Sequence, residues 1–201
     1  MNHPIQCQCG NLRGSVETGH SVNRGVCYCS DCQAFARFLK READILDGAG
    51  GTDVVQTEPR YVSFHQGREH LACVCLTPRL LRWYAACCNT PIGNTLPNAK
   101  AAFVGLIHSC LEHAPASLDE SFGPVRMHVH TRHAWGEQKP KQVGFAPAAL
   151  RVLTTLIRAR LDGSYRQTPF FGADGRPVAT PLMIGAQELR ALKGEGRDGE
   201  G

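Results

Sequence analysis

Cysteine clusters are the part of this sequence with the clearest chemical meaning. The chain holds ten cysteines in 201 residues, and three of them form a C-x-C-x-x-C motif made of Cys27, Cys29 and Cys32. Thiolates bind zinc in a tetrahedral arrangement, and close spacing lets one short segment supply several ligands. Three protein ligands leave one position open, which is typical of a catalytic zinc. The motif therefore predicts a zinc site. A structural site with a fourth ligand from elsewhere in the chain is the alternative.

A second group of cysteines is divided between two distant segments. Cys7 and Cys9 form a C-x-C that precedes Gly10, while Cys87 and Cys88 are adjacent. In an extended C-x-C both side chains point to one face, and the glycine lets the backbone turn sharply afterwards. We expect the segment around Cys87 and Cys88 to complete a closed, structural zinc site with Cys7 and Cys9. Packed free thiols are the alternative.

The remaining cysteines predict packing rather than chemistry. Cys73 and Cys75 lie in the apolar segment from Leu71 to Leu76, and Cys110 has no neighbouring cysteine. Because a buried cysteine behaves as a small hydrophobic residue, we expect these three in the core.

Composition and charge favour a globular intracellular protein. Hydrophobic residues make up 42% of the chain, and the formal net charge is +4 with no run of Lys or Arg. Nucleic acid is therefore not an expected partner. The N-terminus lacks the pattern of a secretory signal, and the longest apolar stretch, residues 101 to 107, is too short to span a membrane. We expect a cytoplasmic location, where reduced thiols are available for metal.

Alternating hydrophobicity predicts a mainly β fold with antiparallel strands. Gly, Pro and Asn separate the expected strands. The expected strands are residues 12–17, 61–65, 71–76, 80–84, 101–107 and 125–130.

Helical periodicity stands out in two further segments. The first runs from Ser30 to about Lys40, with Ser30 or Asp31 as its N-cap. Helical spacing places Cys32, Phe35, Ala36 and Leu39 on one face. Cys32 then lies in the first turn, where the helix dipole favours a thiolate.

The second helix follows Pro147 and is expected to end at Gly163. Its apolar stripe, predicted to pack against the core, is made of Leu150, Leu153, Leu156, Ile157 and Leu161. Residues 1–135 are expected to form a zinc-binding β domain, and residues 136–192 a helical extension that begins with a polar linker at 137–143. Residues 193–201 are predicted to be a disordered tail.

The order of the cysteine motifs resembles that of the glutathione-dependent formaldehyde-activating enzyme family, which also includes centromere protein V. The resemblance rests on Cys7-Gln8-Cys9-Gly10, then the Cys27 to Cys32 motif, then Cys88-Asn89-Thr90-Pro91. A later segment, Met127 to His130 with Trp135, is similar to the closing strand of that family. The similarity covers about residues 5 to 135.

This resemblance implies a β fold of the Mss4-like type with two zinc sites. The first and last cysteine pairs would form the structural site, and Cys27, Cys29 and Cys32 the catalytic one. The implied activity is that of a carbon–sulfur lyase acting on a small thiol adduct, such as that of glutathione and formaldehyde. The alternative is a non-catalytic, zinc-stabilised binding module, because the fold does not by itself require activity.

Two positions depart from the family pattern. Ala85 stands where the family has the first cysteine of its last C-x-x-C, and Asn89 replaces a glycine. Three outcomes follow for the structural site: Cys87 turns to complete it, Cys73 or Cys75 supplies the ligand, or the metal is lost. Asn tolerates the left-handed conformation, so we expect the turn to survive.

Some polar and aromatic residues remain open in role. Alternation along the expected strand places His128 and His130 on one face, with His133 beyond them. These histidines are candidates for extra metal ligands or acid–base groups, but solvated or hydrogen-bonded histidines are the more common case. Phe170 and Phe171 either line a pocket or, as we expect, pack under a loop.

Overall fold

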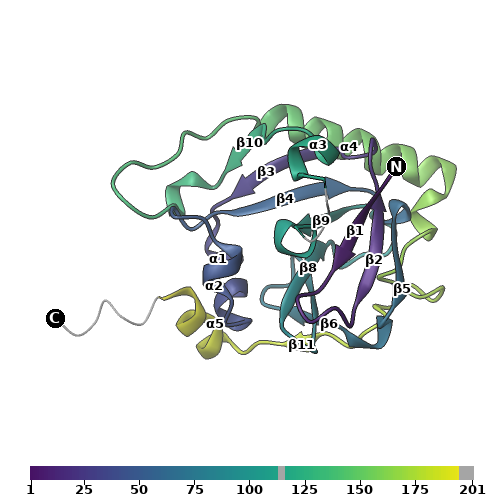
Figure 1. The fold of residues 1–201 in the computed structure, drawn as a ribbon, viewed down its shortest axis with the longest axis horizontal. Helices are drawn as coiled ribbons and strands as arrows, with labels where there is room; N and C mark the ends of the chain where they lie inside the picture. Colours follow the sequence, from purple (N-terminus) through teal and green to yellow (C-terminus); the bar gives the residue numbers. More distant parts are fainter. Residues whose placement is uncertain (113–115, 195–201) are drawn as a thin grey trace.

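The computed structural model describes residues 1–112 and 116–194, and its fold is mainly β with five helices among these residues. Two sheets form the body of the molecule (Figure 1). The small sheet has the order β1 (Asn2–Gln6), β2 (Arg13–Glu17) and β5 (Val62–Gln66). The large sheet has the order β10 (Met127–Val129), β3 (Asn23–Cys27), β4 (Thr52–Thr57), β9 (Val104–Ile107), β8 (Thr90–Thr95), β7 (Leu81–Ala85), β6 (Leu71–Cys75) and β11 (Leu182–Met183).

Each of the six expected strands is confirmed, with small shifts at the ends. The expectation of antiparallel pairing is wrong at two places, because β10 pairs parallel with β3 and β11 pairs parallel with β6. Both strands arrive through long connections, which free them from the hairpin geometry that imposes antiparallel pairing. Gly25 permits the first of these pairings, since a Cβ there would lie 2.6 Å from Met127 Cβ.

The main core lies between the two sheets. Ile5, Leu12 and Val16 of the small-sheet region pack with Trp83 and Leu106 of the large sheet. Phe170 and Phe171 join this core, and the Phe170 ring centroid lies 5.2 Å from that of Trp83, so the expected packing role is confirmed. Cys73, Cys75 and Cys110 are also buried here, as predicted.

A second core covers the opposite face of the large sheet. It is formed by α1 (Ser30–Phe38), α2 (Glu42–Ile45) and α5 (Ala186–Lys193), which lies beside α1 (Figure 1). Phe35 and Leu39 of the α1 segment pack here with Val74 of β6. Successive side chains of a strand point to opposite faces, so Cys73 and Val74 join different cores.

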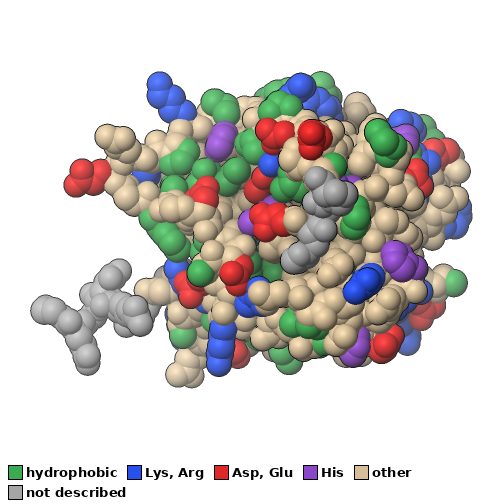
Figure 2. Space-filling view, in the orientation of Figure 1, with side chains coloured by type: hydrophobic (Ala, Val, Ile, Leu, Met, Phe, Trp, Pro, Cys, Tyr) green, Lys and Arg blue, Asp and Glu red, His purple; other side chains and the backbone are tan. Residues whose placement is uncertain are grey.

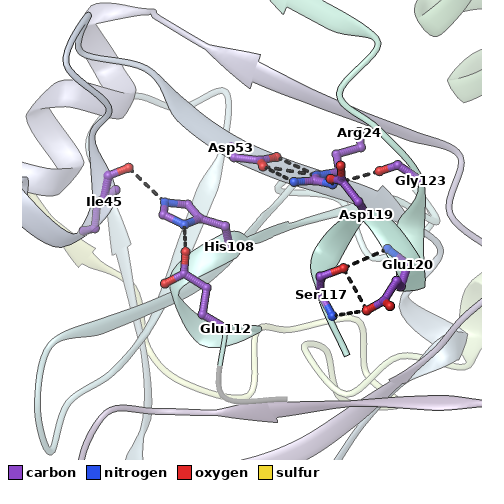
Figure 3. A network of polar contacts seen from close by, with 9 residues as sticks. All are labelled: Arg24, Ile45, Asp53, His108, Glu112, Ser117, Asp119, Glu120 and Gly123. Atoms are coloured by element: carbon purple, nitrogen blue, oxygen red, sulfur yellow. Dashed lines mark hydrogen bonds and ion pairs between the residues drawn. The ribbon is translucent and has the colours of Figure 1, made fainter. Parts of the chain in front are cut away.

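Charged contacts attach the short helix α3 (Leu118–Phe122) to the sheet. Arg24 of β3, only 9% exposed, bonds both carboxylate oxygens of Asp53 and also contacts Asp119 (Figure 3). Its Nη1 also donates to the Gly123 carbonyl at 2.8 Å. Elsewhere, basic side chains are scattered over the surface drawn in Figure 2 rather than gathered into one patch.

Helix α4 (Phe145–Asp162) follows the predicted period but not the predicted packing. Leu150, Leu153, Ile157 and Leu161 are 53% to 83% exposed, so the expectation that this stripe packs into the core is wrong. The helix instead buries Ala148 and Ala159, because small side chains allow its backbone to approach β10 and its neighbours. The helix begins at Phe145, two residues earlier than the predicted start after Pro147. Its C-cap is Gly163 in the left-handed conformation, so the predicted end is confirmed.

The tail prediction falls partly outside the described residues. Lys193 ends α5, and residues 195–201 are not described. Among the described residues, no helix combines the length and apolar character needed to cross a membrane.

Candidate metal centres

The junction between β3 and α1 brings the first cysteine motif together. Cys27 is the last residue of β3, and α1 begins at Ser30. The chain therefore turns within the motif, and the sulfur atoms of Cys27, Cys29 and Cys32 all lie within 4.8 Å of one another. We refer to these three residues as the cysteine triplet.

The N-cap of α1 differs from the sequence prediction. Cys29, rather than Ser30 or Asp31, occupies the capping position, and its sulfur accepts a hydrogen bond from the Cys32 N–H at 3.4 Å. A sulfur atom takes the place of the usual capping oxygen, so one residue both caps the helix and belongs to the triplet. As predicted, Cys32 lies in the first helical turn.

A buried arginine lies behind the triplet. Arg82 of β7 is 2% exposed, and its Nη1 is 3.9 Å from Cys32 Sγ and 3.2 Å from Asn94 Oδ1. Its guanidinium also lies 5.4 Å from the centre of the Phe35 ring. Hydrogen bonds from Cys27 and Cys29, together with the charge of Arg82, hold the pKa of Cys32 well below its usual value in spite of burial. The surroundings therefore favour a thiolate at Cys32.

Sequence reasoning did not identify Arg82. The available signal was its place in a predicted strand next to Trp83, because alternation sends the two side chains to opposite faces. Trp83 enters the core between the sheets, and Arg82 points toward α1. The sequence does not show that α1 covers the face of the large sheet toward which Arg82 points, so it does not show that Arg82 is buried.

The second candidate centre joins the N-terminal segment to the β7–β8 turn. The sulfur atoms of Cys7, Cys9, Cys87 and Cys88 all lie within 4.8 Å of one another. Cys9 Sγ is 3.5 Å from Cys7 Sγ and 3.2 Å from Cys87 Sγ, and Cys7 Sγ is 3.8 Å from Cys87 Sγ. Sulfurs placed about 2.3 Å from one zinc ion in a tetrahedron are about 3.8 Å apart. The group, here called the four-cysteine cluster, is thus compatible with metal binding.

This geometry bears on the three outcomes left open by Ala85. Ala85 ends β7 and is fully buried. Cys87, two residues later, brings its sulfur into the cluster, whereas Cys73 and Cys75 are buried in the core. Of these three cysteines, Cys87 is therefore the one whose sulfur lies in the cluster.

Local backbone geometry holds the four-cysteine cluster in place. The Leu12 N–H donates to Cys7 Sγ at 3.2 Å, and Gly10 has a φ of 76°, so the chain folds back after Cys9. On the other side, burial acts to raise the pKa of Cys88, but hydrogen bonds from Thr90 and the Cys9 backbone outweigh it and lower that pKa to about 6. The cluster thus offers a thiolate at neutral pH, the form that binds metal.

Asn89 supports the turn that carries Cys87 and Cys88. Its φ is 55°, in the left-handed region, so the expectation that the turn survives the loss of glycine is confirmed. We expect Asn89→Ala to lower the free energy of unfolding by about 1 kcal/mol, because a Cβ without a compensating polar group disfavours this conformation. Asn89→Gly should leave stability unchanged or raise it. Urea denaturation measures both, and equal losses in the two variants would contradict the prediction.

The histidines do not share one face. His128 lies within β10 and its Nδ1 is 3.3 Å from the Tyr28 hydroxyl, whereas His130 follows the strand with a φ of 57°. Only His130 of the two lines the same pocket as the cysteine triplet. The left-handed residue breaks the alternation on which the expectation rested. His133 lies beyond, in contact with the Arg132 side chain.

Chemically, both groups consist of thiols alone, and that donor set suits zinc better than hard cations such as Mg²⁺ or Ca²⁺. The two groups differ in number of donors. The four-cysteine cluster has enough sulfur atoms for all four corners of a tetrahedral metal site, whereas the triplet has enough for three.

Comparison with known proteins yields a family and a distant structural likeness. A model described as a family of unknown function (DUF6151) matches residues 2–181. No curated protein matches the chain. A crystal structure of a Rhodobacter sphaeroides protein is similar with a TM-score of 0.42 and 16% sequence identity, over 61% of this chain and 96% of that one.

Proposed function

Because the chain belongs to this family of unknown function (DUF6151), we propose its function from the site itself. The protein is a zinc-dependent enzyme that makes or breaks a carbon–sulfur bond in a small thiol adduct. Cys27, Cys29 and Cys32 hold the catalytic zinc, and Cys7, Cys9, Cys87 and Cys88 hold a structural one.

The observation that carries the proposal is the arrangement of the cysteine triplet. Three sulfurs within 4.8 Å of one another also line a pocket, so a ligand in that pocket reaches the same place. Three protein ligands and one open position are the arrangement of catalytic rather than structural zinc. The four-cysteine cluster differs in that its four sulfurs leave no metal position open for a substrate.

Arg82 contributes to the charge balance of the triplet. A buried guanidinium requires a nearby negative charge, and Cys32 Sγ lies 3.9 Å away. Three thiolates carry a charge of about −3, a zinc ion +2 and Arg82 +1, so the loaded site is close to neutral before a substrate enters. This balance limits the cost of burying the thiolates.

The chemistry follows from stabilising sulfur as an anion. When bound, zinc stabilises a substrate sulfur as a thiolate. In a hydroxymethyl thioether the hydroxyl would give its proton to water, the carbon–oxygen double bond would form and the carbon–sulfur bond would break, leaving the electron pair on sulfur. Addition is the reverse. The motif order that resembles the formaldehyde-activating family supports this reaction class.

Metal counting tests the proposal. We expect two zinc ions per chain in the parent protein and one in the variant with serine at positions 27, 29 and 32, because the two groups are separate. Elemental mass spectrometry of folded, reduced protein measures this number. An unchanged zinc content in the variant would contradict the assignment of the triplet.

Cobalt separates the enzyme from the binding module. In cobalt-substituted protein, 2-mercaptoethanol should change the visible absorption, because a thiol enters the open position of the triplet site. The change should be absent from the triple serine variant. A parent spectrum that does not respond to the thiol would favour a non-catalytic, zinc-stabilised module.

A further inference from the structure

A pocket of about 430 Å³ opens beside the cysteine triplet. This volume lies in the range of sites for small molecules. All three cysteines of the triplet line it, so its chemistry and its shape belong to one site. The nature of the other walls therefore determines which thiol can bind there.

Helix α4 supplies one complete wall of this pocket. The wall residues are Phe145, Ala148, Ala149, Val152, Leu153 and Leu156. They recur at the spacing of one helical face, and every one of them is apolar. The helix lies beyond residue 135, in the segment expected to be an extension, so this segment helps to form the site.

The facing wall comes from the large sheet and its loops, and most of its side chains are apolar. Leu80, Phe103 and Val129 contribute to it. Among the described residues that line the pocket, Gln56, Asn94 and His130 carry the polar side chains, and none is Lys, Arg, Asp or Glu. Arg82 lies behind Cys32 and is not part of the lining.

This lining does not match glutathione. Glutathione carries two carboxylates and one ammonium group, and each loses hydration on entering a pocket without a charged partner. An alkyl or aryl group, in contrast, gains free energy with each methylene that leaves water. Phe145 and Leu153 are both 54% exposed, so an apolar ligand would also cover side chains that now face solvent.

We infer that the substrate is a thiol or thiol adduct with an apolar alkyl or aryl body. Its sulfur faces Cys27, Cys29 and Cys32, and its body lies against α4. The inference rests on the proposed function, because the triplet must hold a metal that accepts the sulfur. It adds the class of substrate and gives α4 the role of a specificity wall.

A homologous series of thiols tests this inference by binding rather than by turnover. Ethanethiol, butanethiol, hexanethiol and glutathione are titrated by calorimetry into the zinc-loaded protein. We expect affinity to increase about fourfold for each added methylene, and glutathione to bind more weakly than butanethiol. Hexanol, which has the same chain without sulfur, should bind more weakly than hexanethiol.

Two leucines of α4 provide a matched pair of variants. Leu153 lines the pocket and is 54% exposed, whereas Leu150 is 61% exposed and is not part of the lining. We expect Leu153→Asp to weaken hexanethiol binding about tenfold by placing a charge beside the alkyl chain, and Leu150→Asp to leave it unchanged. Both side chains face solvent, so both variants should fold and retain two zinc ions.

The outcomes separate the inference from the proposed function. Rising affinity along the series, lost in Leu153→Asp alone, supports an apolar substrate. If short thiols and glutathione bind as tightly as hexanethiol, the inference is wrong while zinc–thiol chemistry stands. If no thiol binds to protein that holds two zinc ions, the proposed function fails and the inference fails with it.

Discussion

Replacing Cys7 and Cys9 by serine is expected to remove one zinc ion per chain and to lower the free energy of unfolding by about 4 kcal/mol or more. The four-cysteine cluster joins residues 7 and 9 to the β7–β8 turn, almost eighty positions later. Because a metal that binds the native state alone contributes its binding free energy to folding, losing it removes that contribution. Chemical denaturation with parallel zinc analysis measures both effects.

A buried cysteine outside the clusters serves as the control for this variant. Cys73→Ala shortens a core side chain that is 2% exposed and should cost about 1 kcal/mol without loss of zinc. A strong chelator should lower the stability of the parent protein more than that of the Cys7 and Cys9 variant, because the variant has already lost the zinc ion of the four-cysteine cluster. Full zinc content and unchanged stability after the double substitution would refute a structural metal.

Replacing Arg82 by glutamine should weaken zinc binding at the triplet about 10- to 100-fold, as is usual when a group that orients or balances metal ligands is lost. Arg82 Nη1 is 3.9 Å from Cys32 Sγ, and its charge lowers the pKa of that thiol. Without the arginine, protonation of Cys32 competes more strongly with the metal. Competition with a chromophoric chelator measures zinc affinity at both sites separately.

Arg24 offers the matched control, because it is also a buried arginine. It bonds Asp53 and contacts Asp119, and among the described residues it forms no hydrogen bond with a cysteine. Arg24→Gln should therefore reduce stability, since breaking a buried ion pair is costly, while zinc affinity at the triplet stays at the parent value. Equal losses of zinc affinity in the two variants would indicate a general effect of unfolding instead.

The two groups of cysteines could be predicted from the sequence because they depend mainly on the spacing of residues along the chain. A C-x-C-x-x-C brings three sulfurs together through local geometry, whatever the rest of the fold does. Cys87 was harder to place, because it lies two residues beyond the position that the family resemblance assigns. Its role depends on how the β7–β8 turn aims the side chain, and that turn is shaped by a left-handed Asn89.

Features that depend on distant packing could not be read in this way. The sequence of α4 showed an apolar stripe at helical spacing. Such a stripe is expected both for a helix face buried in the core and for a helix face beside an open pocket, so the sequence could not separate the two. Five strands were missed, namely β1, β3, β4, β8 and β11. Asn, Gly or Pro interrupt the apolar pattern of β1, β3 and β8. The division of the chain at residue 135 stays a prediction, although α5 and β11 pack directly on earlier elements.

The order of strands in the large sheet has a consequence for folding during synthesis. Its two outermost strands, β10 and β11, come from residues 127–129 and 182–183, while the strands they cover, β3 and β6, are made much earlier. Until the late segments emerge from the ribosome, β3 and β6 expose unpaired backbone groups, which invite pairing with other chains. Such non-local pairings also form slowly. The growing chain is thus most exposed to aggregation before residues 127–129 emerge, and the edge at β6 stays open until residues 182–183 emerge.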